Sequence, residues 1–67
     1  MKKTEMTIQL IELYKKYYDM SEEDGAAYED VRKKLSDLNA ELYLNYDFET
    51  VQEIKFTVNN AIDNYLN

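Results

Sequence analysis

The sequence predicts an all-α protein, one small antiparallel three-helix bundle that occupies residues 1–67 as a single domain. The first observation is that proline is absent and glycine occurs once, at Gly25, so little in the chain would interrupt a helix. The second is that apolar residues recur at steps of three and four in three segments, at about residues 4–18, 24–45 and 48–66. Apolar and polar residues rarely alternate over the length of a strand, which argues against a β-structure.

The first predicted helix, residues 4–18, has one apolar face and ends in basic residues. The face consists of Met6, Leu10, Leu13, Tyr14 and Tyr17. Thr4 is expected to cap the N-terminus through its hydroxyl group. Lys15 and Lys16 fall in the last turn, where the helix dipole favours positive charge. We therefore expect a helix that buries one face against the rest of the bundle.

The second predicted helix, residues 24–45, has a stripe that alternates steps of three and four. The stripe consists of Tyr28, Val31, Leu35, Leu38 and Leu42. Ser21 and Asp24 have the spacing of a capping box, with Asp in place of the usual Glu. Gly25 weakens a helix that starts so early, so a start nearer Ala26 or Ala27 is the alternative.

The third predicted helix, residues 48–66, follows Asp47, which is expected to be its N-cap. Its stripe consists of Val51, Ile54, Val58, Ile62 and Tyr65. Glu49 lies in the first turn, where the helix dipole favours negative charge. The three stripes together are expected to form the core of the bundle.

The composition excludes several classes of function. Cysteine and histidine are absent, which removes disulfides, thiolate zinc sites and the commonest general base. Ser21 and Ser36 therefore have no histidine to activate them, and a single glycine cannot form a phosphate loop. We expect a protein that is not an enzyme and that carries no cofactor.

The charge of the chain indicates what kind of partner it would bind. The net charge is −6, which disfavours direct contact with nucleic acid or with an anionic membrane and favours a basic protein surface. No stretch approaches the ~20 apolar residues that span a bilayer, and the N-terminus does not read as a signal peptide. A cytoplasmic protein is the expectation.

The segment YYDMSEEDGAAYED, residues 17–30, is rich in carboxylates and lies between two predicted helices, as does a calcium-binding loop. With Asp19 at the first loop position, Asp24 falls where the loop requires glycine, and Asp30 falls where it requires glutamate. A start at Met20 corrects the glycine but removes the first ligand. No metal site is expected, and the acids serve either to attract a partner or to keep a loop solvated.

Several apolar residues lie outside the three stripes, and they predict a contact surface. They are Ile8, Ile11, Tyr18, Leu44 and Phe56. The surface serves either a homo-oligomer or a different protein, and the sequence leaves both alternatives open. The other interpretation is that the first helix lies between the other two, or that single exposed apolar residues are ordinary. Tyrosine beside carboxylate, as in Tyr18–Asp19 and Tyr46–Asp47, is well suited to arginine on a partner. The candidate partner-binding residues are Tyr18, Asp19, Glu22, Glu23, Asp24, Tyr46 and Phe56.

In size, acidic composition and fold class, the chain resembles small acidic helical proteins of phages and plasmids of low-GC bacteria. These include host-takeover inhibitors, anti-CRISPR proteins, immunity proteins and antitoxins. No motif carries the resemblance, so it assigns no role to any residue. It implies an inhibitor or regulator that occludes a basic or nucleic-acid-binding surface of a partner protein, for example as a DNA mimic. The alternative is a small homo-oligomeric structural protein, such as a homodimer.

Overall fold

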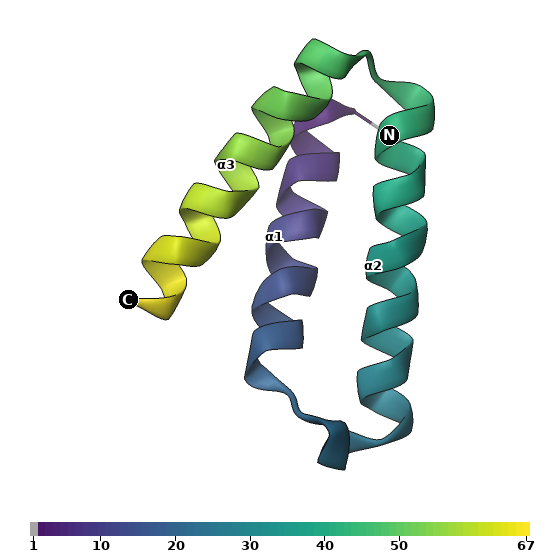
Figure 1. Cartoon of the computed structure of the whole chain (residues 1–67), viewed down its shortest axis with the longest axis vertical. Coiled ribbons are helices and arrows are strands. Elements are labelled where there is room, and N and C mark those ends of the chain that lie inside the picture. The colour runs from purple at the N-terminus through teal and green to yellow at the C-terminus, as the bar shows by residue number, and fades with distance from the viewer. Residues whose placement is uncertain (1) are drawn as a thin grey trace.

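The computed structural model describes residues 2–67 and consists of three helices and one short 3-10 turn (Figure 1). Helix α1 spans Lys3–Asp19, the turn η1 spans Glu22–Asp24, α2 spans Ala26–Asn45 and α3 spans Phe48–Leu66. All three helices contact one another, which confirms the predicted three-helix bundle. None of the helices described is both long and apolar enough to cross a membrane.

Helix α1 lies between the other two helices and packs extensively against both (Figure 1). Helices α2 and α3 meet near the connection between them and then diverge, so they contact each other much less. The molecule is shallow, with principal extents of 37, 26 and 16 Å. One end of the bundle is therefore closed, and the other is splayed around α1.

The core consists of ten buried apolar side chains. They are Met6, Leu10, Val31, Leu35, Leu38, Leu42, Val51, Ile54, Val58 and Ile62. All ten belong to the predicted stripes, because a period close to that of the helix places them on one face of each element. Two predictions at the edges were wrong. Ile11, expected on the outer surface, packs against the core, whereas Tyr65, expected on the stripe, is 44% exposed.

The N-terminus of α3 is capped as the sequence predicts. The Asp47 carboxylate accepts a hydrogen bond from the backbone N–H of Thr50 at 2.8 Å. Hydrogen bonds from the Thr50 side chain and backbone lower the pKa of Asp47, because they stabilise its charged form. Helix α1 differs from the prediction, since Thr4 lies inside it and Lys2 is the N-cap residue, without a side-chain hydrogen bond.

Helix α2 begins at Ala26, which is the alternative start that Gly25 indicates, rather than at residue 24. The cause is Gly25, whose φ of +62° and ψ of −123° are not helical and suit glycine alone. The predicted capping box exists but belongs to η1. The backbone N–H of Ser21 donates to the Asp24 carboxylate at 2.7 Å, and the Ser21 side chain accepts from the Asp24 backbone.

Candidate functional site

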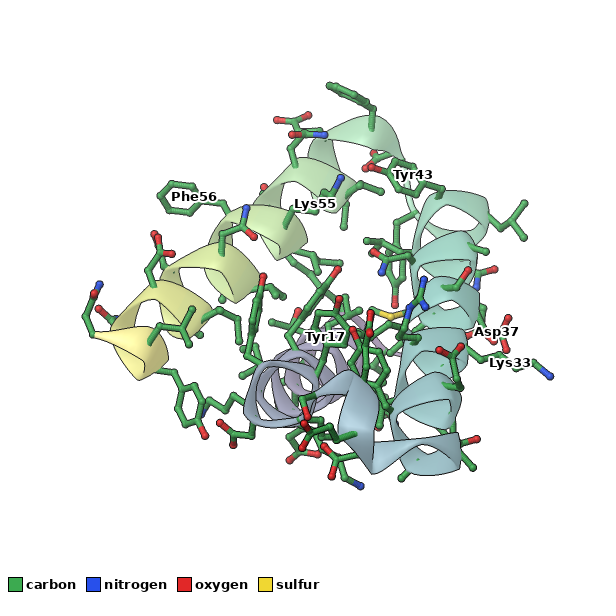
Figure 2. The ribbon with its side chains drawn as sticks, turned by 60° about the horizontal axis from the view of Figure 1, so that its bottom comes forward. Tyr17, Lys33, Asp37, Tyr43, Lys55 and Phe56 are labelled. Carbon is green, nitrogen blue, oxygen red and sulfur yellow. The ribbon has the colours of Figure 1, made fainter. Side chains whose placement is uncertain are left out.

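The structure does not bring the seven candidate partner-binding residues into one surface. Five of them, from Tyr18 to Asp24, lie at the splayed end, where α1 connects to α2 (Figure 1). Tyr46 lies at the opposite end, where it is half-buried against the core. Phe56 lies midway along α3 and points away from the other helices (Figure 2). The splayed end is thus where most of the candidates gather.

The acids of the splayed end have different roles, and two of them are committed to the fold. The Asp24 carboxylate is held in the capping box of η1, and the Asp19 carboxylate accepts a hydrogen bond from the hydroxyl of Tyr65 on α3. Glu22 and Glu23 are exposed. Within residues 2–67, no group of three or more carboxylates is arranged to hold a metal ion. Glu22 and Glu23 are therefore the acids that can attract a partner without disturbing the bundle.

Four tyrosines form a row across the splayed end, which we call the tyrosine row: Tyr14, Tyr18, Tyr17 and Tyr28. The rings of Tyr14 and Tyr18 stack at 6.5 Å, those of Tyr18 and Tyr17 meet edge to face at 5.5 Å, and those of Tyr17 and Tyr28 stack at 5.5 Å. The Tyr28 hydroxyl donates to the Tyr17 hydroxyl at 3.4 Å, and this bond raises the pKa of Tyr28. The row continues from α1 onto α2.

The tyrosine row occupies the space that opens as α2 and α3 diverge. Tyr17 points from α1 into this space (Figure 2). The Tyr14 hydroxyl accepts a hydrogen bond from the side-chain amide of Asn39 on α2 at 3.3 Å. Aromatic rings therefore fill part of the space between α2 and α3 where the two helices do not touch. This role accounts for four of the seven tyrosines.

On its α3 side, the row forms the wall of a surface hollow of about 450 Å³. The hollow, which we call the tyrosine hollow, is lined by Tyr14, Tyr18, Val58, Asn59, Ile62, Asp63 and Leu66. Tyr18 and Leu66 are 51% and 56% exposed. Asp63 forms no ion pair with another residue of the described chain. The hollow thus combines aromatic, aliphatic and anionic groups in one accessible place.

Contacts of Tyr65 hold α3 against α1 beside the hollow. Its hydroxyl donates to the Asp19 carboxylate, and the Lys15 ammonium lies 5.1 Å from the centroid of its ring. The hydrogen bond to Asp19 raises the pKa of Tyr65, since ionisation of the hydroxyl would place two negative charges together. The Asp19 carboxylate, expected to face a partner, therefore secures the C-terminal turns of α3.

The outer side of α3 carries a second exposed surface, the phenylalanine ridge, formed by Phe48, Gln52 and Phe56. The two rings are 76% and 69% exposed and lie four residues on either side of the glutamine. Beside the ridge, Glu53 forms an ion pair with Lys3 of α1. The ridge thus exposes two aromatic rings, and one of its neighbouring acids is already neutralised.

Sequence reasoning found Tyr18 but missed Asp63 and Leu66 as its neighbours. Both lie off the α3 stripe and carried no motif, and their position opposite Tyr18 depends on how α3 crosses α1. No family model matches the chain, and comparison with curated proteins and with solved structures found no significant similarity. The side chains themselves are therefore the basis for assigning a function.

Proposed function

We propose that the protein is a non-enzymatic regulator that binds and occludes a basic surface of another protein. The observation that supports this most directly is the tyrosine hollow, which includes the Asp63 carboxylate and lies at the same end of the bundle as the exposed acids Glu22 and Glu23. Exposed aromatic side chains provide contact area at a small entropic cost and are enriched among residues that dominate binding energy. Carboxylates beside them favour a basic partner.

The charge of the whole molecule supports the same partner class. With a net charge of −6, the chain repels nucleic acid and attracts positively charged protein surfaces over about a Debye length. Surfaces that bind nucleic acid are positively charged for the same reason. A nucleic-acid-binding protein of the host cell is therefore the partner that we propose, in keeping with the resemblance to small acidic inhibitors of phages and plasmids.

The proposal is tested by affinity capture from a lysate of the source cells, with and without nuclease, followed by measurement of binding rates. We expect to capture a partner that stays bound after nuclease treatment. Binding to the three-helix protein should release nucleic acid from that partner. Association should slow about tenfold or more between low and high salt, because charge steers the encounter. An association rate that does not depend on salt would contradict a role for the acids.

A matched pair of variants isolates the splayed end. Glu22→Lys with Glu23→Lys reverses two charges at η1, and Asp37→Lys with Glu41→Lys reverses two exposed charges on α2. Both changes alter the net charge equally. Slower association of the first variant alone would support binding through the splayed end. Equal slowing would show that only the net charge matters.

A second candidate function, a structural homodimer, is favoured by the phenylalanine ridge. A two-fold axis through Gln52 would bring Phe48 of each copy toward Phe56 of the other, as an isologous interface requires. Light scattering over a range of concentrations tests it. A dimer that Phe56→Glu dissociates and that Leu44→Glu, a change on the outside of α2, leaves intact would establish this candidate. A monomer at all concentrations would eliminate it.

A further inference from the structure

We infer that the tyrosine hollow receives an arginine side chain of the partner protein, with the guanidinium group placed between the ring of Tyr18 and the carboxylate of Asp63. This inference rests on the proposed function and names the chemistry that the partner must present. It depends on three features of the hollow. The first is that other tyrosines of the protein already contact a cation. The second is the mixture of aromatic, apolar and anionic groups that lines the hollow. The third is that the arginine of the chain already has partners elsewhere.

Two tyrosines of the protein already contact a cation from the same chain. The guanidinium of Arg32 lies 5.9 Å from the centroid of Tyr28, at the α2 end of the tyrosine row. The Lys55 ammonium donates to the Tyr43 hydroxyl at 2.5 Å and lies 5.1 Å from the ring centroid, so it meets this ring at its hydroxyl edge (Figure 2). In each case a cation of the chain engages a tyrosine, and a cation placed over an exposed ring is favourable by about 0.5–1 kcal/mol.

The α3 end of the row differs from the α2 end. No cation within residues 2–67 lies over Tyr18, and Asp63 on the facing wall has no ion pair among the same residues. The ring and the carboxylate line one hollow. They offer a cation both a π-face and an opposite charge, which are the two groups that a buried or half-buried guanidinium requires.

The shape and composition of the hollow favour arginine over lysine. A guanidinium is planar and weakly hydrated, so it can stack on an aromatic ring while donating two hydrogen bonds to a carboxylate. The methylene groups of its side chain would lie on Val58, Ile62 and Leu66, which form the apolar part of the lining. An ammonium group is a strongly hydrated point charge and gains less from such a site.

The arginine must come from another molecule, because Arg32 is the one arginine in the sequence and is already engaged. Arg32 pairs with Glu29 and covers Tyr28, Lys34 pairs with Asp30, and Lys15 covers Tyr65. Lys16, which has no ion pair among the described residues, lines a different hollow with Gln9 and Glu12. A basic partner protein is therefore the occupant that the complementary charge indicates.

Nuclear magnetic resonance titration of the isotope-labelled protein tests the inference with two peptides of equal length, oligo-arginine and oligo-lysine. We expect the arginine peptide to shift the signals of Tyr18, Ile62, Asp63 and Leu66. It should bind about two- to fivefold more tightly than the lysine peptide, because a guanidinium can stack on the ring while it donates two hydrogen bonds to the carboxylate. Equal affinity for the two peptides, or shifts confined to Glu22 and Glu23, would overturn the inference.

Matched variants localise the effect. Asp63→Asn and Tyr18→Leu should each weaken binding of the arginine peptide about threefold or more. Asp37→Asn, which removes the same charge from the outer side of α2, should weaken it less than twofold (Figure 2). Circular dichroism melting verifies that the variants fold. If Asp63→Asn and Asp37→Asn lowered the affinity for the arginine peptide equally, net charge alone would explain binding, and a specific site would be refuted.

The captured partner separates failure of the inference from failure of the proposed function. If Tyr18→Leu and Asp63→Asn leave the affinity for a captured basic partner unchanged, the inference is wrong and the proposed function stands. If capture yields no basic partner, the proposed function is wrong, and the peptide titration still decides whether the hollow selects arginine. If the resonances of the residues lining the hollow shifted with protein concentration and without peptide, a second copy of the chain would be the occupant, and the inference would be overturned.

Discussion

The two connections between helices are built in opposite ways. The connection between α2 and α3 has two residues, Tyr46 and Asp47, of which the first packs against the core and the second caps α3. The connection between α1 and α2 has six residues, from Met20 to Gly25, and includes η1. Its acids are exposed, and its glycine adopts a conformation that other residues avoid.

The difference indicates how stability and binding are divided within the molecule. At the tight connection, α2 and α3 meet over fully buried side chains such as Leu42. At the splayed end, α1 and α3 line the accessible tyrosine hollow, and the connection from α1 to α2 exposes its carboxylates. Substitutions at the tight end should therefore change folding, and most substitutions at the loose end should change binding. The predictions below test this division, beginning with the largest effect.

The largest effect is expected for Leu42→Ala. Leu42 is 0% exposed, and its truncation should lower the free energy of unfolding by about 2–5 kcal/mol through lost burial and a residual cavity. A chain of this size has little stability to lose, so the variant should be largely unfolded at about 37 °C. Urea unfolding followed by circular dichroism measures the change.

Leu44→Ala is the matched control, because it makes the same chemical change two residues away, where the side chain is 83% exposed. It should alter the free energy of unfolding by less than about 0.5 kcal/mol. Similar effects of the two substitutions would contradict the packing of the tight end.

Gly25→Ala should have the next largest effect. It is the exception at the loose end, because it should change folding rather than binding. A Cβ atom added at Gly25 would meet no atom within 4 Å beyond its two chain neighbours, so there is room for the methyl group. The cost therefore arises from the backbone alone, at about 1–3 kcal/mol. D-alanine, introduced at position 25 by chemical synthesis, has the opposite preference and should not destabilise the protein. If both substitutions destabilised it equally, the positive φ would not be the cause.

Asp47→Ala should lower the melting temperature by about 5 °C at pH 7, because α3 loses its N-cap. The pKa of Asp47 is lowered in the folded protein, so its carboxylate stabilises the fold above the unfolded pKa of about 3.9. That contribution is lost as the pH falls through the lower, folded value. The difference between wild type and variant should therefore shrink in acid, and melting curves at several pH values measure it.

Asp47→Asn is the control for the charge, since asparagine is an equally good N-cap and does not titrate. Its melting temperature should stay close to that of the wild type at pH 7. A difference between wild type and Asp47→Ala that stayed constant down to about pH 2 would show that the cap does not act through the carboxylate.

The smallest effect is expected for Tyr65→Phe. It removes one exposed hydrogen bond to Asp19, so the melting temperature should fall by less than about 3 °C. The pKa of Tyr65 is raised, so its contribution is complete below the unfolded pKa of about 10 and is lost as the pH rises through the folded value. Alkaline titration followed by tyrosinate absorbance should lose a late-ionising tyrosine in the variant. An unchanged titration curve would exclude the bond.

The fold was accessible from the sequence because its determinants are local. Four of the five residues in each of the second and third stripes are buried, and Asp47 caps α3 as its type and position predict. The periodicity of a helix fixes which residues share a face, and capping depends on residues within one turn. The start of α2 stayed open between residue 24 and Ala26 because the capping box at Ser21 also fits a 3-10 turn.

The candidate site was only partly accessible, because it depends on how the helices cross. The aromatic excess and the pairing of Tyr18 with nearby acids were visible in the sequence. The position of Asp63 beside Tyr18 was not, since the two are far apart in the chain and on different helices. Likewise, nothing local indicated that Tyr65 would engage Asp19, which changes that acid from a candidate contact into part of the fold.

The central position of α1 has a consequence for the order in which the chain can fold. Contacts between α1 and α2 join neighbouring helices, whereas those between α1 and α3, such as Lys3–Glu53 and Asp19–Tyr65, close loops of 50 and 46 residues. Local contacts form first, since long loops cost more entropy to close. During synthesis, the α1–α2 hairpin would therefore emerge with one side of α1 uncovered. Helix α3, Phe48–Leu66, would then complete the bundle by covering that side.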